Sequence, residues 1–364
     1  MSKIRYLCLT GLALSLAACT QTPALKDQSS NQQSQGVAAP VVGSGAASQP
    51  SPFDSSLKPQ MAFGDCTVTP ARVLVTLRPR ASTQVSKNIC IHTFPDKLDF
   101  MLVVDNTGSY GDDIFHLKSS GGNLARKIVD GIRSTPGNVS DSVFGLATFL
   151  DFSDTPNPYF LKQQLTFNDT DFITAVDAMT AGGGGDTPES QYNALWHAAV
   201  GPGGAAWRPD ATRIIALTTD ATFHDADTEP GYPAPGKVAT IATLKAQHVQ
   251  VIGLKAPGAG SELDDIVAVT GGAVKNTTSS SSDIVDAVLD ALKNIQYPLT
   301  AKPVGNCAIN FGYTPAAPVV AAGTNYVWNE TITAPGTVGD YTCTVEFRAG
   351  AALLGTQQVT VRVR

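Results

Sequence analysis

Oxygen-bearing side chains gather where one apolar run of the chain ends. The run DFMLVV (99–104) is followed by DNTGSYGDD, in which Asp105, Thr107 and Ser109 stand at alternate positions. In a loop that leaves a strand, these side chains can converge on one point. One carboxylate and two hydroxyls suit a hard cation, above all Mg²⁺, which keeps waters as further ligands. The same residue types also suit a solvated loop that caps the next helix, so this motif alone leaves both interpretations open.

Two later segments carry carboxylates toward the same place. The glycine run GGGGDTPES (182–190) delivers Asp186 and Glu189 at the entrance to a helical pattern, and TTDAT (218–222) places Asp220 at the end of another apolar run. The glycine run is not a phosphate-binding loop, because no Gly-Lys-Ser/Thr follows it. Acidic loops that meet at one rim repel one another unless a cation lies between them, which favours a metal site.

The elements that would position these loops alternate between strand and helix patterns. Apolar runs predict strands at 99–104, 143–150, 213–219 and 249–254, and amphipathic stretches predict helices at 113–133, 172–181, 189–200, 237–247, 262–269 and 282–295. Buried strands interleaved with helices indicate an α/β fold, with a mostly parallel, Rossmann-like sheet covered on both faces. Ligands bind beyond the carboxyl ends of the strands in such sheets, which is where Asp105 would lie.

The segments on either side of this region have a different pattern. Residues 66–94 and 304–364 alternate polar and apolar side chains in short runs separated by turn signals, which is typical of an antiparallel sandwich. Neither flank has enough strands alone, whereas together they could form one sandwich. We therefore predict an immunoglobulin-like all-β sandwich made of 60–95 and 299–364, interrupted by a metal-binding α/β domain at 96–298.

Several motifs together resemble the head of an integrin β subunit, in which a von Willebrand A-type (VWA) domain is inserted into a hybrid β-sandwich. DNTGSYGDD, DTPE (186–189) and RPDATRIIALTTDAT (208–222) are similar to the inserted domain. PARVLVTLRP (70–79) is similar to the first half of the hybrid domain, and SSDIVDAVLDAL (281–292) to the last helix before its second half. The resemblance spans residues 66–364 with the motifs in the same order, and it implies a VWA-type fold.

The resemblance also implies three adjoining cation positions. The implied ligands are Asp105, Thr107, Ser109, Glu189 and Asp220 for a central Mg²⁺ or Mn²⁺; the Ser109 carbonyl, Asp112 and Asp113 for an adjacent Ca²⁺; and Asp151, Asp186, the Pro188 carbonyl and Glu189 for a third, flanking Ca²⁺ position. Asp112 and Asp113 also suit the first turn of a helix, where the dipole favours acids. Asp151 could simply begin a turn, and Gly184 stands where the family has an asparagine donor.

An exposed metal ion with an open coordination position would accept a carboxylate from another molecule. We therefore expect cation-dependent adhesion to a protein that presents an Asp or Glu side chain. The alternatives are a structural subunit of a cell-envelope assembly and, less favoured, a metal-dependent hydrolase. The sequence lacks H-E-x-x-H and G-x-S-x-G motifs, so we expect no enzyme. A net charge of -6 without a basic block argues against a nucleic-acid partner.

The N-terminal residues predict a membrane anchor. Residues 1–19 contain a short apolar run after two basic residues and end in LAAC, which resembles a bacterial lipobox with Cys19 as the lipidated residue; an ordinary signal peptide is the alternative. Lipid on Cys19 would hold the protein in the cell envelope, and Thr20 favours the outer membrane or cell surface in a cell with two membranes. Residues 20–59, rich in Gln, Ser, Ala, Gly and Pro, predict a disordered tether.

Four cysteines remain after the signal segment: Cys66, Cys90, Cys307 and Cys343. Four cysteines in an exported protein indicate two disulfides, for which three pairings are possible. We favour Cys66 with Cys90 and Cys307 with Cys343.

Overall fold

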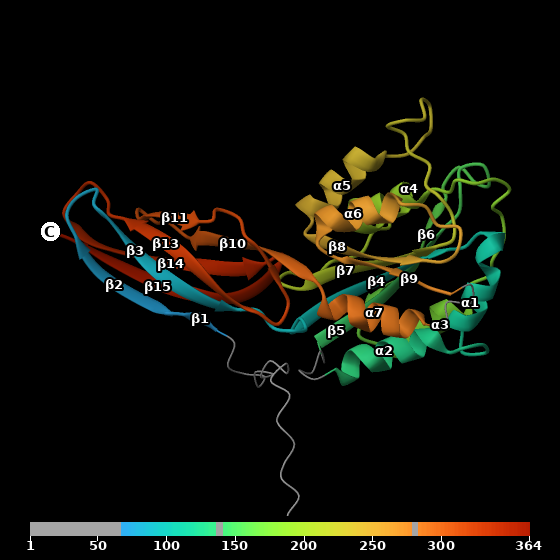
Figure 1. The fold of residues 1–364 in the computed structure, drawn as a ribbon, viewed down its shortest axis with the longest axis horizontal. Coiled ribbons are helices and arrows are strands. Elements are labelled where there is room, and N and C mark those ends of the chain that lie inside the picture. The colour runs from blue at the N-terminus through green and yellow to red at the C-terminus, as the bar shows by residue number, and fades with distance from the viewer. Residues whose placement is uncertain (1–66, 136–140, 279–282) are drawn as a thin grey trace, which may run out of the picture. The chain divides into compact units, whose positions relative to one another are not determined.

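The computed structural model describes residues 67–135, 141–278 and 283–364 (Figure 1). The predicted signal peptide, the lipidation residue Cys19, the tether and Cys66 lie outside the described residues. The described residues belong to one compact unit. Within the described segments, no helix combines the length and the apolar character that crossing a bilayer requires.

A six-stranded sheet forms the centre of the α/β region, with the strand order β6-β5-β4-β7-β8-β9. Its strands are β4 (Lys97–Asp105), β5 (Asp141–Phe149), β6 (Tyr159–Thr166), β7 (Thr212–Thr219), β8 (Val249–Lys255) and β9 (Ala273–Asn276). All neighbouring pairs are parallel except β5 with β6. The predicted α/β class with a mostly parallel sheet is confirmed.

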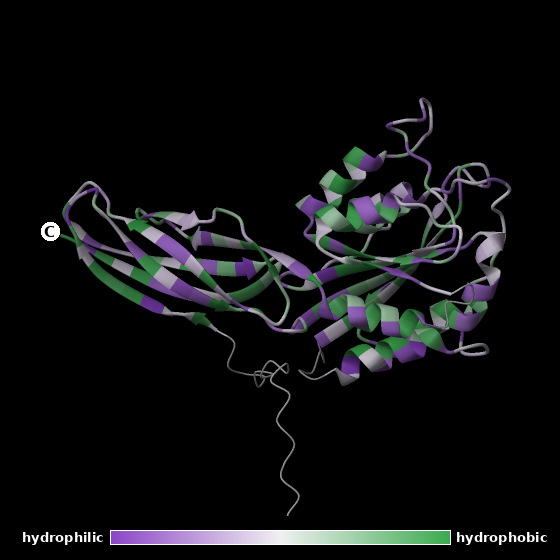
Figure 2. Cartoon of the chain, in the orientation of Figure 1, coloured by the Kyte–Doolittle hydropathy of each residue, from purple (hydrophilic) through white to green (hydrophobic). Residues whose placement is uncertain are grey.

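Helices cover both faces of this sheet (Figure 1). One face carries α1 (Gly111–Leu117), α2 (Leu124–Ser134), α3 (Asp169–Asp177) and α7 (Ile284–Lys293), and the other carries α4 (Gln191–Val200), α5 (Lys237–Ala246) and α6 (Glu262–Thr270). Strand β4 serves both cores, because Phe100 and Leu102 pack with the first set of helices and Met101 and Val103 with the second. Figure 2 shows long hydrophobic stretches within the central strands, as expected for a sheet buried on both sides.

Two details of the α/β region differ from the sequence prediction. The single helix predicted at 113–133 is two helices, α1 and α2, joined by a tight turn. A Cβ atom on Gly121 would lie 1.9 Å from the Phe115 carbonyl oxygen, so the chain turns back closely here. The edge strands β6 and β9 were not predicted, because partly exposed edge strands mix polar and apolar side chains and give no apolar run.

Strands from before and after the α/β region share two further sheets. The first has the order β1-β3-β13-β11 and the second β12-β10-β14-β15-β2. Their strands are β1 (Val68–Thr69), β2 (Arg72–Leu77), β3 (Ser82–Cys90), β10 (Gln296–Val304), β11 (Asn310–Thr314), β12 (Val319–Ala321), β13 (Asn325–Thr333), β14 (Gly339–Ala349) and β15 (Ala352–Val363).

The pairing joins the two ends of the described chain directly. Strand β3 pairs antiparallel with β13, and β2 pairs parallel with β15. Val73, Ile332 and Val361 from both sheets share one buried cluster, so the sheets pack face to face as a sandwich. Strand β10 of the sandwich begins at Gln296, slightly before residue 299, where the second sandwich segment was predicted to start. The domain boundaries themselves stay a prediction.

The sandwich contains one of the predicted disulfides. Cys307 and Cys343 are bonded, with their Cα atoms 5.4 Å apart. Cys90 is also disulfide-bonded. Cys66 lies outside the described residues, so its pairing with Cys90 stays a prediction.

A buried ion pair crosses between two strands of the sandwich. Lys87 on β3 and Glu330 on β13 are both fully buried, and Lys87 Nζ lies 2.8 Å from a Glu330 carboxylate oxygen. The Tyr313 hydroxyl donates a hydrogen bond of 2.8 Å to the other oxygen. Burial lowers the pKa of Lys87, while the carboxylate of Glu330 raises it. The charge of Glu330 is thus compensated within the protein.

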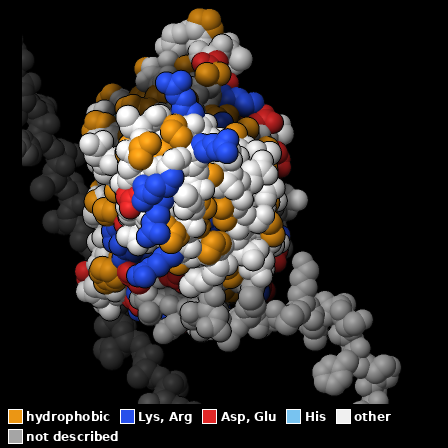
Figure 3. Space-filling model, turned by 90° about the vertical axis from the view of Figure 1, so that its left-hand side faces the viewer, with side chains coloured by type: hydrophobic (Ala, Val, Ile, Leu, Met, Phe, Trp, Pro, Cys, Tyr) orange, Lys and Arg blue, Asp and Glu red, His pale blue; other side chains and the backbone are white. Residues whose placement is uncertain are grey.

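The end of the sandwich nearest the C-terminus has a mixed surface. Figure 3 shows basic, acidic and apolar side chains interspersed on this face. Arg364, the last residue, pairs with Asp340 at 2.6 Å. The acidic side chains visible on this face are therefore scattered among side chains of other kinds.

Candidate metal centre

The loop after β4 presents the first group of oxygen atoms. Asp105, the last residue of β4, is fully buried. Its Oδ1 accepts hydrogen bonds from the Thr107 backbone N–H at 3.0 Å and from Thr107 Oγ1 at 2.7 Å, and its Oδ2 accepts one from Thr219 Oγ1 at 2.6 Å. Thr107 Oγ1 lies 3.2 Å from Ser109 Oγ. Neutral donors therefore fix the orientation of the carboxylate without neutralising its charge.

The loop after β7 joins this group through a side-chain contact. Ser109 Oγ donates to Asp220 Oδ1 at 3.1 Å, and Asp220 follows directly after β7. In the parallel pairing of β4 with β7, Val104 lies opposite Thr218, so both strands end at the same level. The structure thus brings together four of the predicted central residues: Asp105, Thr107, Ser109 and Asp220.

Glu189 reaches the same edge from the loop before α4. Its backbone N–H donates to the Thr222 carbonyl at 2.9 Å and its carbonyl accepts from the His224 N–H at 2.8 Å, which ties this loop to the exit of β7. Gly184 has a φ of +74°, and a Cβ there would lie 2.7 Å from Thr107 Cβ and 3.1 Å from Glu189 Oε1. A glycine is required here because the backbone passes closely over both side chains.

Like charges dominate the electrostatics of this edge. Burial raises the pKa of Asp105 to about 6, and the nearby Asp220 charge adds to the shift. Burial also raises the pKa of Glu189 to about 8, with further contributions from the carboxylates of Asp105 and three more aspartates. Both shifts mean that a negative charge is poorly compensated in this place.

The residues present fit a divalent cation. Glu189 is 2% exposed, and within the described segments its Oε2 is a buried atom with no hydrogen-bond partner. Asp105, Thr107, Ser109 and Asp220 add carboxylate and hydroxyl oxygens, which are the donors that Mg²⁺ takes. A bound cation would give the orphaned oxygen a partner and offset the repulsion between the carboxylates.

The adjacent position rests on the start of α1. Asp112 is exposed and Asp113 is buried, and both lie in the first turn of that helix. This placement suits the helix dipole as well as a Ca²⁺ ligand, so the predicted set of Ser109, Asp112 and Asp113 stays a prediction.

A third group lies on the other side of Glu189. One ligand atom each from Asp151, Asp186 and His224 lies within 4.8 Å of the others. Asp151 and Asp186 were predicted from the sequence, together with Glu189 and the carbonyl of Pro188, whereas His224 was not. Asp154 was also missed; its carboxylate accepts from the Gly184 N–H at 2.9 and 3.0 Å. His224 follows β7, as Asp220 does, and Asp154 follows β5, as Asp151 does. This position in the sequence was the available sign that both residues lie at the same edge of the sheet.

The fold and this acidic edge together define a VWA-type domain with an acidic rim. Comparison with known proteins agrees: the model of the integrin beta chain VWA domain matches residues 151–251. This part of the chain includes Asp151, Asp186, Glu189 and Asp220.

Integrin β chains are also similar over longer stretches. Human integrin beta-4 is 24% identical over 176 residues, which cover 43% of this chain and 9% of that protein. Integrin beta-2 of Sus scrofa is 27% identical over 201 residues, covering 50% of this chain and 25% of that protein. Human integrin beta-7 is 22% identical over 281 residues, covering 65% of this chain and 35% of that protein. The chain therefore carries an integrin-β-like VWA domain and matches only a minor part of each relative's length.

Proposed function

We propose that this protein is a cation-dependent binding module whose central ion accepts an Asp or Glu carboxylate from a partner protein. Asp105, Thr107, Ser109, Glu189 and Asp220 would hold Mg²⁺ or Mn²⁺. The observation that carries the proposal is the orphaned oxygen of buried Glu189, which lies among carboxylates of the same charge. When bound, the ion supplies the positive charge that a partner carboxylate needs.

The chain's own residues would orient and expose this ion. Thr107 and Thr219 hold the Asp105 carboxylate in one direction, while Ser109 and Asp220 lie on the outer side, where they are more exposed than Asp105. A partner carboxylate would therefore approach from the side of Ser109. All three relatives described above are integrin β chains, which supports adhesion over catalysis.

The remaining features of the proposal concern the surroundings of this centre. Ser109, Asp112 and Asp113 would hold a Ca²⁺ that steadies the start of α1. The sandwich made of 60–95 and 299–364 would present the inserted domain at 96–298. Lipid on Cys19 would anchor the protein to the cell envelope, at the outer membrane or cell surface where two membranes exist.

Capture of envelope proteins by the immobilised full chain tests the proposed function. We expect a protein to be retained in Mg²⁺ or Mn²⁺ and released by EDTA, because the bridge runs through the ion. Asp105→Ala should reduce retention at least about 100-fold, a loss of about 2.7 kcal/mol. Asp130→Ala, at an exposed position of α2, is the matched control and should retain the partner.

Two results would count against this function. A partner that stays bound in EDTA would indicate the structural-subunit alternative. Normal retention by a folded Asp105→Ala variant would remove the central position from the binding mechanism.

A further inference from the structure

The third group differs from the rest of the rim because it contains an imidazole. Asp151 comes from the loop after β5, Asp186 from the loop before α4 and His224 from the loop after β7. Their ligand atoms lie within 4.8 Å of one another. Ligand atoms at about 2.0–2.2 Å from a tetrahedral ion lie about 3.3–3.6 Å apart, so these groups must move inward to complete a site.

The hydrogen bonding of His224 selects the ring nitrogen that faces the group. His224 Nδ1 lies 2.5 Å from Glu229 Oε2, and the Asp225 N–H donates to the other Glu229 oxygen at 3.1 Å. A carboxylate only accepts hydrogen bonds, so in the neutral imidazole Nδ1 carries the proton and Nε2 has the lone pair that a metal ion needs. Nε2 lies 3.9 Å from Asp151 Oδ1. A carboxylate on one nitrogen and an open second nitrogen is the arrangement of metal-binding histidines.

Neighbouring side chains hold the three groups in place. The Tyr232 ring stacks on the His224 ring with centroids 4.4 Å apart, and its hydroxyl donates to Asp151 Oδ1 at 2.5 Å. Ser153 donates its N–H to Asp151 Oδ2 at 2.8 Å and its hydroxyl to Asp186 Oδ1 at 2.7 Å. These contacts fix the directions of all three side chains before any ion binds.

The charge balance of this group calls for a cation. In the part of the chain that the structure describes, no lysine or arginine forms an ion pair with Asp151, Asp154, Asp186 or Glu189. Glu189 feels the charges of Asp151, Asp154 and Asp186, and its buried Oε2 has no hydrogen-bond partner among the described residues. A cation held by Asp151 and Asp186 would offset the repulsion among these carboxylates, while Glu189 Oε2 stays available to the central ion.

We propose that Asp151, Asp186 and His224 form a metal site for an imidazole-accepting divalent ion such as Zn²⁺, in place of the Ca²⁺ expected at this position. Ca²⁺ takes oxygen ligands, whereas imidazole nitrogen suits transition metals, among which Zn²⁺ binds more tightly than Mn²⁺.

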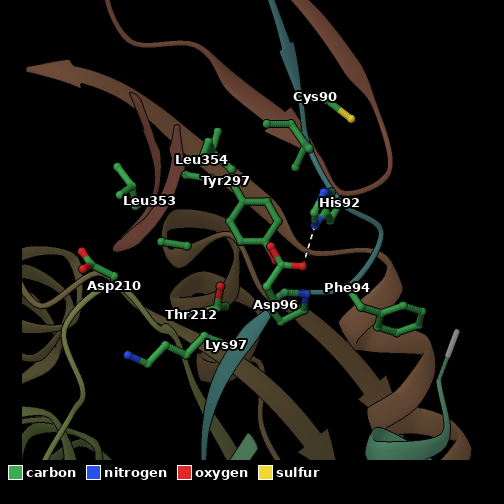
Figure 4. Close-up of a pocket in the computed structure, with 14 residues that line it drawn as sticks. Cys90, His92, Phe94, Asp96, Lys97, Asp210, Thr212, Tyr297, Leu353 and Leu354 are labelled. Carbon is green, nitrogen blue, oxygen red and sulfur yellow. Dashed lines mark hydrogen bonds and ion pairs between the residues drawn. The ribbon is translucent and has the colours of Figure 1, made fainter. Parts of the chain in front are cut away.

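Another histidine of the chain provides a matched control. His92 Nδ1 lies 2.6 Å from Asp96 Oδ1, a contact of the same kind as that of His224 with Glu229 (Figure 4). In Figure 4 these two side chains point toward one another beside Tyr297. Within the described residues, His92 belongs to no group of three or more metal-binding side chains. A histidine with one carboxylate neighbour should therefore bind no ion tightly.

Zinc titration of the full chain against a chromophoric chelator tests the proposal. We expect one tight Zn²⁺ equivalent that His224→Gln weakens on the order of 100-fold and Glu229→Gln about 10-fold, as for a ligand and its supporting carboxylate. His92→Gln should change the affinity less than about 2-fold. Equal zinc affinity in wild type and His224→Gln, or an equal loss in His92→Gln, would overturn the proposal.

Two further measurements keep the outcome independent of folding and of the central ion. X-ray absorption of the zinc-loaded wild-type chain should show imidazole scattering, and a purely oxygen shell would contradict the site without any variant. Asp105→Ala should keep the zinc, because Asp105 is not a ligand here. If Asp105→Ala loses cation-dependent adhesion but still binds zinc, the loss concerns the central site alone. The two proposals can therefore fail independently.

Discussion

Two buried glutamates in this molecule have opposite surroundings. Glu330 in the sandwich is fully buried and meets the Lys87 ammonium at 2.8 Å. Glu189 at the rim is 2% exposed and is surrounded by aspartates. The sandwich provides its own countercharge because the pair has only to be stable. Among the described residues no lysine or arginine pairs with Glu189, and the proposed ion would supply the missing countercharge.

A second buried carboxylate follows the same division. Asp99, fully buried on β4, accepts from Arg208 Nε at 2.5 Å and from the Arg208 backbone N–H at 2.6 Å. Asp105 lies on the same strand and is equally buried, but its donors are neutral threonine groups. Among the described residues, the aspartate near the amino end of the strand pairs with an arginine, and the aspartate at its carboxyl end pairs with no lysine or arginine. This difference is consistent with the proposed cation site at the carboxyl end of the strand.

Replacing each glutamate by glutamine should separate the two regions, with the largest effect in the sandwich. Glu330→Gln leaves the buried Lys87 ammonium without its partner charge, so we expect a loss of about 3 kcal/mol in the free energy of unfolding. Urea denaturation with Mg²⁺ and with EDTA measures it. The loss should be equal in both, because this pair is not part of the metal centre.

The double variant Lys87→Met with Glu330→Gln is the control for the sandwich. Removing both charges should recover most of the lost stability, because no buried charge then remains unpaired. A Glu330→Gln protein as stable as wild type would show that this ion pair does not balance the sandwich interior.

Glu189→Gln should have the opposite sign in the metal-free protein. Removal of one of several like charges should raise the free energy of unfolding in EDTA at pH 8 by on the order of 1 kcal/mol. The same variant should bind Mg²⁺ at least about 10-fold more weakly, measured by calorimetry. Destabilisation in EDTA would contradict the assignment of Glu189 as an uncompensated charge.

A smaller effect is the pH dependence of the stability that Glu189→Gln gains in EDTA. The pKa of Glu189 is raised to about 8 in the folded protein, so the folded state holds this proton more tightly than the unfolded state. The stability from this group is therefore complete below the unfolded pKa and is lost as the pH rises toward 8. We expect the advantage of Glu189→Gln over wild type to shrink by at least about half at pH 5, measured by denaturation in EDTA. If Glu189→Gln were stabilised relative to wild type by more at pH 5 than at pH 8, the expected direction of the pH dependence would be wrong.

Local patterns were enough to predict the four inner strands of the sheet and the edge at which Asp105, Thr107, Ser109 and Asp220 meet. Strand β4 could be predicted because its residues are apolar throughout, and Asp105, Thr107 and Ser109 because they follow it at alternate positions. Asp220 could be placed because parallel strands end at one edge. The parallel fold is confirmed, and the side-chain contacts among these residues agree with the predicted grouping.

Features that depend on tertiary contacts could not be predicted. His224 becomes a candidate ligand only because Glu229 turns its ring and because the loop brings it beside Asp151, 73 positions earlier in the chain. Asp154 matters because it accepts from the backbone of Gly184, 30 positions later. The break between α1 and α2 depends on the close approach of Gly121 to Phe115, which no local periodicity reveals.

Anomalous diffraction from crystals of the protein grown in Mn²⁺ tests the central claim most directly. We expect a strong peak between Asp105, Ser109 and Glu189, removed by Asp105→Ala, since Mn²⁺ takes the oxygen ligands that suit Mg²⁺. An ordered rim in Mn²⁺ with no peak at that position would contradict the account.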